Sequence, residues 1–520
     1  MTSLVIMAGY LGLLVVLGIV ANRFFRGTAA DYFTASHSIG PVLLLMSLFG
    51  TTMTAFALVG STGEAYRVGI GVYGMLASWS GLVHAGVFFF IGIRLWAIGK
   101  RYGYITQVQY FRARFESDLL GLILFPILVA LVIPYLLIGL LGAGGVAQSL
   151  TQGAFPEAFA ATNGGLPPWL TGLIISAVVL FYVFFGGLRG AAWANTLQTA
   201  VFIITGLVAF VLISSKLGGL AAASQQVLQA HPERLMRSGS ITQLQFFTYF
   251  FIPLAVGMYP HIFQHWLTAR SAKTFRLSVV MHPIFILIVW APCILIGVWA
   301  TSATLPDGSL VVPAGSPPNT EIATMVHKLT TPLIGGLLGA GIMAAIMSSL
   351  DSQFFCLGTM FTTDIVTHYF GEHRFGDRQR VFLARCFIVA IVAITYLLSL
   401  AEPRHVFPIG IWCFTGFSGL FPLVCTSIYW KRCTRAGALA SVTVMATSWT
   451  LLFRASDYGA DGSYLFLGVL PVATVFIASL LALVGVSLIT QGPSETTIEK
   501  FFPHGGIAAD LPSDTDMATD

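Results

Sequence analysis

Two adjacent hydroxyl side chains, Ser348 and Ser349, interrupt a strongly apolar stretch that runs from residue 331 to residue 366. Ala345 stands one helical turn before Ser349, so the two residues share one face of a helix. A hydroxyl is a neutral oxygen ligand, which suits an alkali cation in a dry cavity. The alternative is that each serine donates a hydrogen bond to a carbonyl oxygen of its own helix. The spacing by itself leaves both interpretations open.

The composition is that of a polytopic membrane protein. Of the 520 residues, 56% are hydrophobic and only 9% are charged, and the mean hydropathy is +0.84. A soluble domain of this size would carry far more charge. No CxxC pattern or Cys/His cluster suggests a metal site, so the cysteines are interpreted as small core residues. They are Cys293, Cys356, Cys386, Cys413, Cys425 and Cys433.

Apolar runs predict an all-α protein with thirteen transmembrane helices. The first run, Leu4 to Val20, is followed rather than preceded by arginines, which is the reverse of a signal peptide and indicates a retained anchor. The other spans are expected at about 41–66, 72–98, 119–148, 168–186, 191–214, 245–268, 276–300, 331–365, 382–400, 406–430, 436–453 and 464–488.

The distribution of basic residues predicts the orientation in the cell membrane. With the N-terminus outside and the C-terminus in the cytoplasm, the inner loops hold 19 of the 26 Lys and Arg residues. This bias is what the positive-inside rule expects. The tail from residue 491 to residue 520 is polar, and we expect it to be disordered inside the cell.

Ionisable residues within membrane spans usually indicate function, and they are few in this sequence. The acidic ones are Glu64 near an outer helix end, Asp351 just after the serine pair and Asp364 near an inner helix end. His84 and His282 lie within spans, and His261 lies in a helix break. The structural interpretation of each histidine is that it is a core residue with a hydrogen bond to a nearby carbonyl oxygen. No carboxylate or histidine chain crosses the bilayer centre, as a proton-driven carrier would require.

Two spans have the sequence of broken helices. The segment 46–60 places Gly50 among threonines at mid-membrane, and the segment 245–268 contains Pro253, Gly257 and Pro260. Irregular backbone at membrane depth is tolerated where it lines a cavity, and its free carbonyls can coordinate a cation. The two breaks lie five spans apart, which indicates an inverted five-helix repeat. The predicted organisation is an extra helix in 1–26, repeats in 41–214 and 245–430, and two C-terminal helices in 433–490.

On these segments the chain resembles the sodium/solute symporter family, whose fold is of the LeuT type. The motifs that carry the resemblance are MSLFGTTMT (46–54), GGLRGAAWANTLQ (186–198), PHIFQHWLTARS (260–271), AAIMSSLDS (344–352) and YWKRCTRAGALA (429–440). The resemblance covers residues 1 to about 490. It implies that the protein is not an enzyme but imports a small organic solute with sodium ions by alternating access. The sodium site that it implies consists of the carbonyls of Gly50, Met53 and Ala345 and the hydroxyls of Ser348 and Ser349.

The chain departs from its relatives at positions that bear on ions and solute. Asn195 stands where many members carry an aspartate that helps to hold a second sodium ion, so we expect one sodium per solute. The acids and amides that proline and sugar carriers of the family use on the first broken helix align with Thr52, Phe56 and Ala57. A sugar needs many hydrogen-bond partners, since unpaired buried hydroxyls are costly.

The expected solute site is therefore largely apolar. Its predicted wall consists of Thr52, Phe56, Ala57, Met75, Leu76, Trp79, Ile252, Val256 and Tyr259. Such a wall favours a solute with an apolar body and one polar end. No cationic side chain in it can pair with a carboxylate, but the N-terminus of a half-helix can. A monocarboxylate-like anion is the preferred solute, and an amino acid or a sugar is the alternative.

Two other classes of function remain as alternatives. An intramembrane enzyme would use His84 or His261 with Asp351, but no HExxH or paired-acid motif is present. A transporter-shaped sensor would usually carry a signalling domain. The expected partners are a small organic solute and the lipid bilayer, with no nucleic acid, and the sequence does not determine the oligomeric state.

Overall fold

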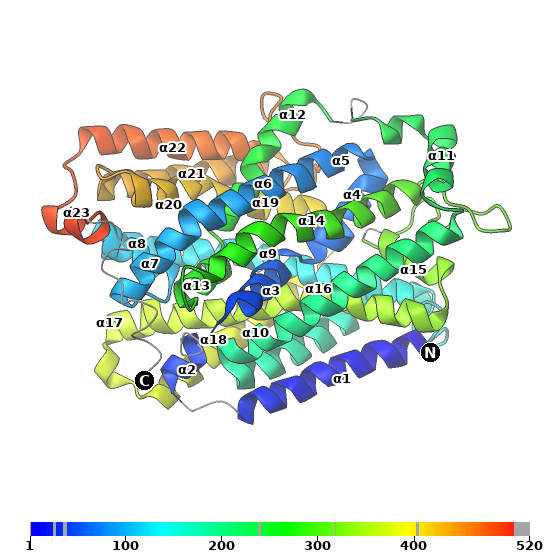
Figure 1. Cartoon of the computed structure of the whole chain (residues 1–520), viewed down its shortest axis with the longest axis horizontal. Helices are drawn as coiled ribbons and strands as arrows, with labels where there is room; N and C mark the ends of the chain where they lie inside the picture. The colour runs from blue at the N-terminus through cyan, green and yellow to red at the C-terminus, as the bar shows by residue number, and fades with distance from the viewer. Residues whose placement is uncertain are drawn as a thin grey trace.

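The computed structural model describes residues 2–23, 28–34, 39–237, 241–317, 319–401 and 405–503. Within these ranges the chain is mainly helical, and no β-strand forms beyond isolated bridges. Most of the long helices run along one common direction in an elongated bundle (Figure 1).

The bundle is built mainly from these long helices: α1 (Thr2–Arg23), α9 (Asp118–Leu150), α10 (Pro168–Lys216), α14 (Thr274–Trp299), α16 (Pro332–Met360), α18 (Asp377–Ser399), α19 (Val406–Gly419), α21 (Arg435–Ala455) and α22 (Pro471–Ile489). Shorter helices complete it: α3 (Pro41–Thr52), α4 (Ser61–Val68), α6 (Trp79–Val87), α7 (Ile93–Tyr102), α8 (Gln107–Phe115), α12 (Gln243–Thr248), α13 (Pro260–Thr268), α15 (Glu321–Leu329), α20 (Phe421–Tyr429) and α23 (Glu495–Phe501).

Both predicted helix breaks are confirmed. The pair Pro41–Thr52 and Phe56–Val68 is bent by 55°, and the pair Gln243–Gly257 and Pro260–Thr268 is bent by 51°. The first break follows Met53, whose backbone (φ −90°, ψ 78°) is not helical. The second break follows a 3-10 segment, η8 (Tyr249–Gly257), and α13 restarts with Pro260 at its first position. Proline fits there because the first residues of a helix have no intrahelical acceptor for their N–H groups.

The number of membrane spans is close to the predicted one. Ten of the described helices are long and apolar enough to cross a membrane, and each bent pair adds one more, to a total of 12. One of the ten, α10, is 49 residues long and contains a non-helical glycine, Gly187 (φ 57°, ψ −157°). A straight helix of that length would be far longer than a bilayer is thick. A Cβ atom at Gly187 would lie 3.0 Å from the carbonyl oxygen of Tyr32, so glycine permits both the bend and the close approach. The predicted thirteen spans stay a prediction.

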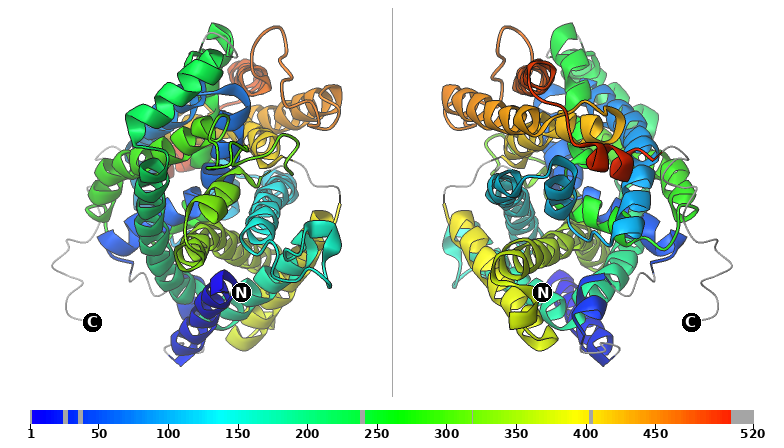
Figure 2. Two further views of the ribbon diagram at one scale, coloured as in Figure 1. Left: turned by 90° about the vertical axis from the view of Figure 1, so that its right-hand side faces the viewer. Right: turned by 90° about the vertical axis from the view of Figure 1, so that its left-hand side faces the viewer.

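The helix that carries the serine pair, α16, lies in the middle of the bundle (Figure 1). Every residue from Leu338 to Met360 is buried. It packs against α3, α9, α10, α13 and α18. Seen from either end, α1 lies on one outer side of the bundle, and α21 and α22 lie on the opposite side (Figure 2).

Two expectations about buried and disordered residues need correction. The cysteines at 293, 356, 413 and 433 are buried as predicted, but Cys386 is exposed because it lies on an outer face of α18. Residues 495–501 of the predicted disordered tail form α23 instead, whose Phe501 is buried against α8. Residues 504–520 lie outside the described residues.

Candidate functional site

The first predicted sodium ligands meet where α3 ends beside α16. The Ser348 hydroxyl oxygen lies 2.7 Å from the Gly50 carbonyl oxygen and 2.9 Å from the Ala345 carbonyl oxygen. Ser348 is fully buried. Three oxygen atoms from two helices therefore lie together, next to the first helix break.

Close packing of α10 against α3 completes this corner. A Cβ atom at Gly50 would lie 2.3 Å from the Thr199 hydroxyl oxygen, so only glycine fits there. Thr199 in turn donates a hydrogen bond to the Met46 carbonyl oxygen, at 3.0 Å. Thr199 was not among the predicted site residues, because nothing in the sequence indicates which residue of α10 faces Gly50.

The other two predicted sodium ligands have different surroundings. Ser349 donates to the Ile346 carbonyl oxygen of its own helix at 2.9 Å, which is the alternative that the spacing left open. Met53 terminates α3, and its N–H donates to the Phe49 carbonyl oxygen at 2.9 Å. Ser348 thus contacts Gly50 and Ala345 directly. Ser349 and Met53 lie one or more residues along the chain from the residues of that contact.

A buried polar cluster adjoins Ser348 on the side of α10. The amide orientation of Asn195 that satisfies both of its ends places the nitrogen 2.8 Å from the Ser348 carbonyl oxygen and 3.0 Å from Asp351 Oδ1. The Tyr182 hydroxyl donates to Asp351 Oδ2 at 3.2 Å. In this orientation the Ser352 hydroxyl donates to the Asn195 side-chain oxygen at 2.8 Å and lies 3.2 Å from Asp351 Oδ1. Asp351 and Asn195 are fully buried. Asn195 itself lacks a charge, but a carboxyl group from α16 lies in contact with it.

The donor set around Ser348 fits a sodium ion. Its atoms are neutral hydroxyl and carbonyl oxygens in a fully buried position, and a carboxyl group lies beyond them. Carbonyls at a broken membrane helix are the ligands that transporters use for sodium.

The second candidate region is an aromatic cluster between the two breaks. The Phe414 ring of α19 lies 4.9 Å from Phe56, 5.8 Å from Tyr259 and 5.2 Å from Tyr135 of α9, measured between ring centroids. Tyr259 also lies 5.1 Å from Phe417. Phe56 and Tyr259, which the sequence selected, therefore belong to one cluster. Tyr135 and Phe414 were not predicted, because the chain has 41 Phe and 16 Tyr residues and nothing in the sequence distinguishes these two.

The remaining predicted wall residues are more scattered. The Thr52 hydroxyl donates back to the Leu48 and Phe49 carbonyl oxygens, both at 2.9 Å, so its polarity is used within α3. Trp79 is directed to the outer part of the second broken helix, where its ring nitrogen donates to the Phe246 carbonyl oxygen at 3.0 Å. The others are also buried: Ala57, Ile252 and Val256 in the segments flanking the breaks, and Met75 and Leu76 in the span Gly71–Tyr102.

Contrary to the structural interpretation of these histidines, no hydrogen bond from His84, His261 or His282 to a carbonyl oxygen is found among the described residues. His84 Nδ1 lies 3.0 Å from His282 Nε2, so these two rings bond to each other between α6 and α14. Neither ring nitrogen of His261 has a hydrogen-bond partner among the described residues. Neither His84 nor His261 is bonded to Asp351, so the structure gives no support to the predicted enzyme alternative.

A cavity of about 250 Å³ leads from one end of the bundle toward the aromatic cluster. Its lining includes Glu64, Arg67, His405, Phe407 and Asp461. Glu64 and Arg67 form an ion pair at 2.6 Å, so the charge of Glu64 is balanced by Arg67. Phe407 also stacks on Phe56, with 5.0 Å between ring centroids, so the cavity borders the aromatic cluster there.

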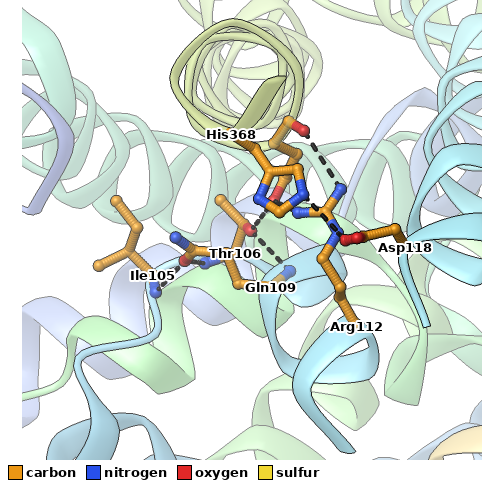
Figure 3. Close-up of polar contacts among 7 residues, drawn as sticks. Ile105, Thr106, Gln109, Arg112, Asp118 and His368 are labelled. Atoms are coloured by element: carbon orange, nitrogen blue, oxygen red, sulfur yellow. Dashed lines mark hydrogen bonds and ion pairs between the residues drawn. The ribbon is translucent and has the colours of Figure 1, made fainter. Parts of the chain in front are cut away.

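The opposite end holds a polar network that fastens α8 to the end of the α16 span (Figure 3). The Thr106 hydroxyl donates to Asp364 Oδ1 at 2.9 Å, and Arg112 donates to the Asp364 carbonyl oxygen at 3.2 Å. Asp118 contacts both Arg112, at 3.4 Å, and His368, at 2.9 Å. Asp364 therefore has a structural role at this end of the bundle.

Comparisons with known proteins agree with this arrangement. The chain is 25% identical over 481 residues to the sodium/pantothenate symporter of Escherichia coli (strain K12), covering 90% of this chain and 92% of that protein. It is 24% identical over 481 residues to the high-affinity proline transporter PutP of Bacillus subtilis (strain 168), covering 91% and 95%.

The fold is that of the LeuT-type transporters. A sodium-coupled sialic acid symporter, solved in a substrate-bound outward-open state, matches 95% of this chain and 99% of its own chain with a TM-score of 0.75 and 18% identity. The model of the sodium:solute symporter family matches residues 32–444. The protein is therefore a multi-pass membrane protein that couples sodium to the transport of a small organic solute, and it belongs to the sodium:solute symporter family.

Proposed function

We propose that this symporter imports a small solute that has an apolar body and one carboxylate end. The sodium ion binds between the first helix break and α16, and the solute binds between the two breaks. The observation that carries the proposal is the contact of Ser348 with the carbonyl oxygens of Gly50 and Ala345, at 2.7 and 2.9 Å.

The sodium site is proposed at Gly50, Met53, Ala345, Ser348 and Ser349. Ser348 already holds α3 against α16 through its contact with Gly50. A cation shared by the same oxygens would strengthen that connection, while its removal would weaken it. Since α3 is one half of a broken helix, a bound sodium ion would favour one position of the broken helix over others. The solute would then bind to the conformation that the ion favours.

The class of solute is inferred from the wall and from the relatives. Pantothenate, proline and sialic acid, which the relatives are named for, all carry a carboxylate group. The aromatic cluster around Phe56, Tyr259 and Phe414 supplies apolar surface but few hydrogen-bond partners. A sugar would leave several hydroxyls unpaired in such a site, at a cost of about 1–3 kcal/mol each. A solute with one polar end avoids that cost.

A zwitterionic amino acid is the second candidate. The rings of Phe56, Tyr135, Tyr259, Phe414 and Phe417 lie within one cluster. Aromatic faces attract ammonium groups when these are removed from water. A solute such as proline would satisfy both the aromatic faces and the requirement for a carboxylate.

Uptake into proteoliposomes tests the proposal. Labelled pantothenate, proline, lactate and glucose are offered with an inward sodium gradient, and a potassium gradient of equal size serves as control. We expect at least one of the three carboxylates, and not glucose, to accumulate only with sodium. Equal accumulation driven by a proton gradient in sodium-free buffer would contradict the sodium assignment, and uptake of glucose alone would contradict the solute class.

A further inference from the structure

His261 is a buried polar side chain that the protein leaves without a partner. It is the second residue of α13, directly after the second helix break, and only 1% of its surface is exposed. Neither Nδ1 nor Nε2 has a hydrogen-bond partner among the described residues. An unpaired polar atom in a buried position costs on the order of 1–3 kcal/mol, so such an atom calls for an explanation.

Two tyrosines lie beside His261. The Tyr259 ring stacks on it at 5.5 Å with an interplanar angle of 12°, and the Tyr135 ring lies at 5.7 Å. The two tyrosine rings are 5.2 Å apart. Their residues are only 5% and 2% exposed, and no hydrogen bond of either hydroxyl is found among the described residues. Three side chains with unused hydrogen-bonding capacity thus gather at one place.

The start of α13 adds backbone donors at the same place. Tyr259 is the N-cap of this nine-residue helix, and it provides no side-chain hydrogen bond to the cap. Pro260, at the first position, has no N–H, and the first intrahelical bond runs from the Phe263 N–H to the Tyr259 carbonyl oxygen at 3.0 Å. The N–H groups of His261 and Ile262 therefore precede the intrahelical ladder. The N-terminus of a helix also carries a partial positive charge.

We propose that His261, with Tyr135 and Tyr259, binds the carboxylate end of the transported solute at the N-terminus of α13. This inference rests on the proposed function. A neutral imidazole donates one N–H, each tyrosine donates one O–H, and the helix contributes backbone N–H groups. A carboxylate accepts several such bonds, and hydrogen bonds to an ionised acceptor are the stronger kind.

The aromatic neighbours define the rest of the solute site. Phe414 contacts both tyrosines, and Phe417 contacts Tyr259. These rings would cover the apolar body of the solute while the donors hold its carboxylate. A ring cluster without donors would instead favour a cation. The hydrogen-bond donors at His261 therefore favour a solute that carries a carboxylate over a cation without a carboxylate.

Matched pairs of solutes provide the test. Each pair has the same body and differs only in that a hydroxymethyl group replaces the carboxylate: pantothenate and pantothenol, proline and prolinol, betaine and choline. The thermal stability of the purified protein is measured with each compound at saturating sodium. We expect at least one acid of the panel to stabilise the protein and its alcohol to leave the melting temperature unchanged.

Variants then assign the effect to His261. His261→Phe keeps the ring and its stacking on Tyr259 but removes the donor, so the apparent dissociation constant of the stabilising acid should rise roughly ten- to a hundredfold. His261→Asn keeps a donor and should restore part of the affinity. His282→Phe is the matched control, because His282 is equally buried but lies on α14 beside His84. Stabilisation by sodium alone should be the same in all variants that fold.

Four results would overturn the inference. The first is an alcohol or choline that stabilises the protein as well as its acid does. The second is an acid whose affinity is the same in His261→Phe and in the unmodified protein, and the third is the absence of stabilisation by any acid of the panel. Sodium-driven uptake of a solute without a carboxylate would refute this inference while leaving sodium symport intact. Uptake that needs no sodium would refute the proposed sodium coupling instead.

Discussion

Ser348 and Ser349 are neighbours in the sequence but have different partners in the structure. The Ser348 hydroxyl contacts the Gly50 carbonyl oxygen on another helix, at 2.7 Å, whereas within the described residues the Ser349 hydroxyl forms a hydrogen bond to Ile346 of its own helix alone, at 2.9 Å. The two hydroxyls are therefore unequal in this conformation. A hydroxyl that reaches a second helix can link ion binding to helix position, and one that bonds within its own helix cannot do so without turning.

The first prediction follows from this difference. Ser348→Ala should raise the sodium concentration for half-maximal uptake more than Ser349→Ala does, because it also removes the contact with Gly50. Losing one neutral ligand is expected to cost about 1–3 kcal/mol, which is roughly ten- to a hundredfold in sodium affinity. Sodium titrations of uptake in both variants measure the effect. Unchanged sodium dependence in both would mean that these hydroxyls only bond within the protein.

The surroundings of Asn195 bear on the predicted number of sodium ions per solute. The prediction of one sodium per solute rests on Asn195 supplying an oxygen but no charge. In the structure a carboxyl group lies beside it, since Asp351 Oδ1 is 3.0 Å from the Asn195 amide nitrogen. The ratio of one sodium per solute stays a prediction, and reversal potentials in proteoliposomes measure it.

The second prediction concerns Asn195→Asp. This change replaces an amide that donates to Asp351 with a second carboxyl group in a buried position, and two such groups repel each other when ionised. The free energy of unfolding in sodium-free buffer should fall by about 3–5 kcal/mol. Sodium should restore more stability to the variant than to the unmodified protein, because a cation can lie between the two groups. If both respond identically to sodium, this polar cluster does not bind the ion.

At the scale of elements, α15 closes against the outer half of the first broken helix. A Cβ atom at Gly63 of α4 would lie 3.2 Å from Glu321 Oε2, so the glycine makes room for this carboxyl group. Glu321 is only 7% exposed, and its Oε2 has no partner among the described residues. Burial raises the pKa of Glu321 from 4.5 to about 6, although backbone N–H groups at the start of α15 act in the opposite direction.

The third prediction uses the sign of this shift. Because the pKa is higher in the folded protein than in the unfolded chain, Glu321 contributes full stability below about pH 4.5, and this contribution is lost as the pH rises through about 6. A shift of this size corresponds to about 2 kcal/mol. Glu321→Gln should therefore gain stability relative to the unmodified protein between pH 5 and pH 7.5. If the difference between the melting temperatures of the two proteins does not change with pH across this range, the assignment is wrong.

The helix α23 shows how a short element depends on its surroundings. It has only seven residues, too few for a stable isolated helix. Ser494 caps it by accepting a hydrogen bond from the Thr497 N–H, and the Tyr102 hydroxyl donates to the Lys500 carbonyl oxygen at 2.7 Å. Glu116 of the adjoining loop accepts from the Ser494 and Thr497 hydroxyls, which lowers the pKa of its carboxyl. Tertiary contacts, rather than sequence propensity, order this segment.

At the scale of the whole molecule, the two ends of the bundle differ in chemistry. The helices α8, α17 (His368–Phe370) and α23 lie at one end, while α11 (Leu220–Ala230) and α15 lie at the other (Figure 1). The first end contains Arg112 and Arg114 of α8 and Lys500 of α23. The helix α1 begins at the opposite end. This arrangement supports the prediction that the N-terminus is outside and the C-terminus is in the cytoplasm.

The fourth prediction tests that orientation. A single cysteine at position 2 should react with a membrane-impermeant reagent from outside intact cells, and one at position 495 should react only after the cells are opened. Cys386 must be replaced in the parent protein, because it is the one native cysteine on an exposed surface of the described residues. Labelling of both positions from outside, or of neither, would refute the predicted topology.

The sequence by itself determined the membrane class, both helix breaks and the serine pair, because composition and helix-breaking residues act locally. Pro260 has no backbone N–H and cannot continue the hydrogen-bond ladder of a preceding helix, and Gly50 and Ser348 belong to short continuous sequence motifs. Only the tertiary structure decided which residues of different helices meet. It brought Thr199 to Gly50, Asp351 to Asn195 and Tyr135 to His261, because these contacts depend on how each helix is rotated and packed. In a chain whose helices are apolar on nearly every face, hydrophobic periodicity does not indicate that rotation.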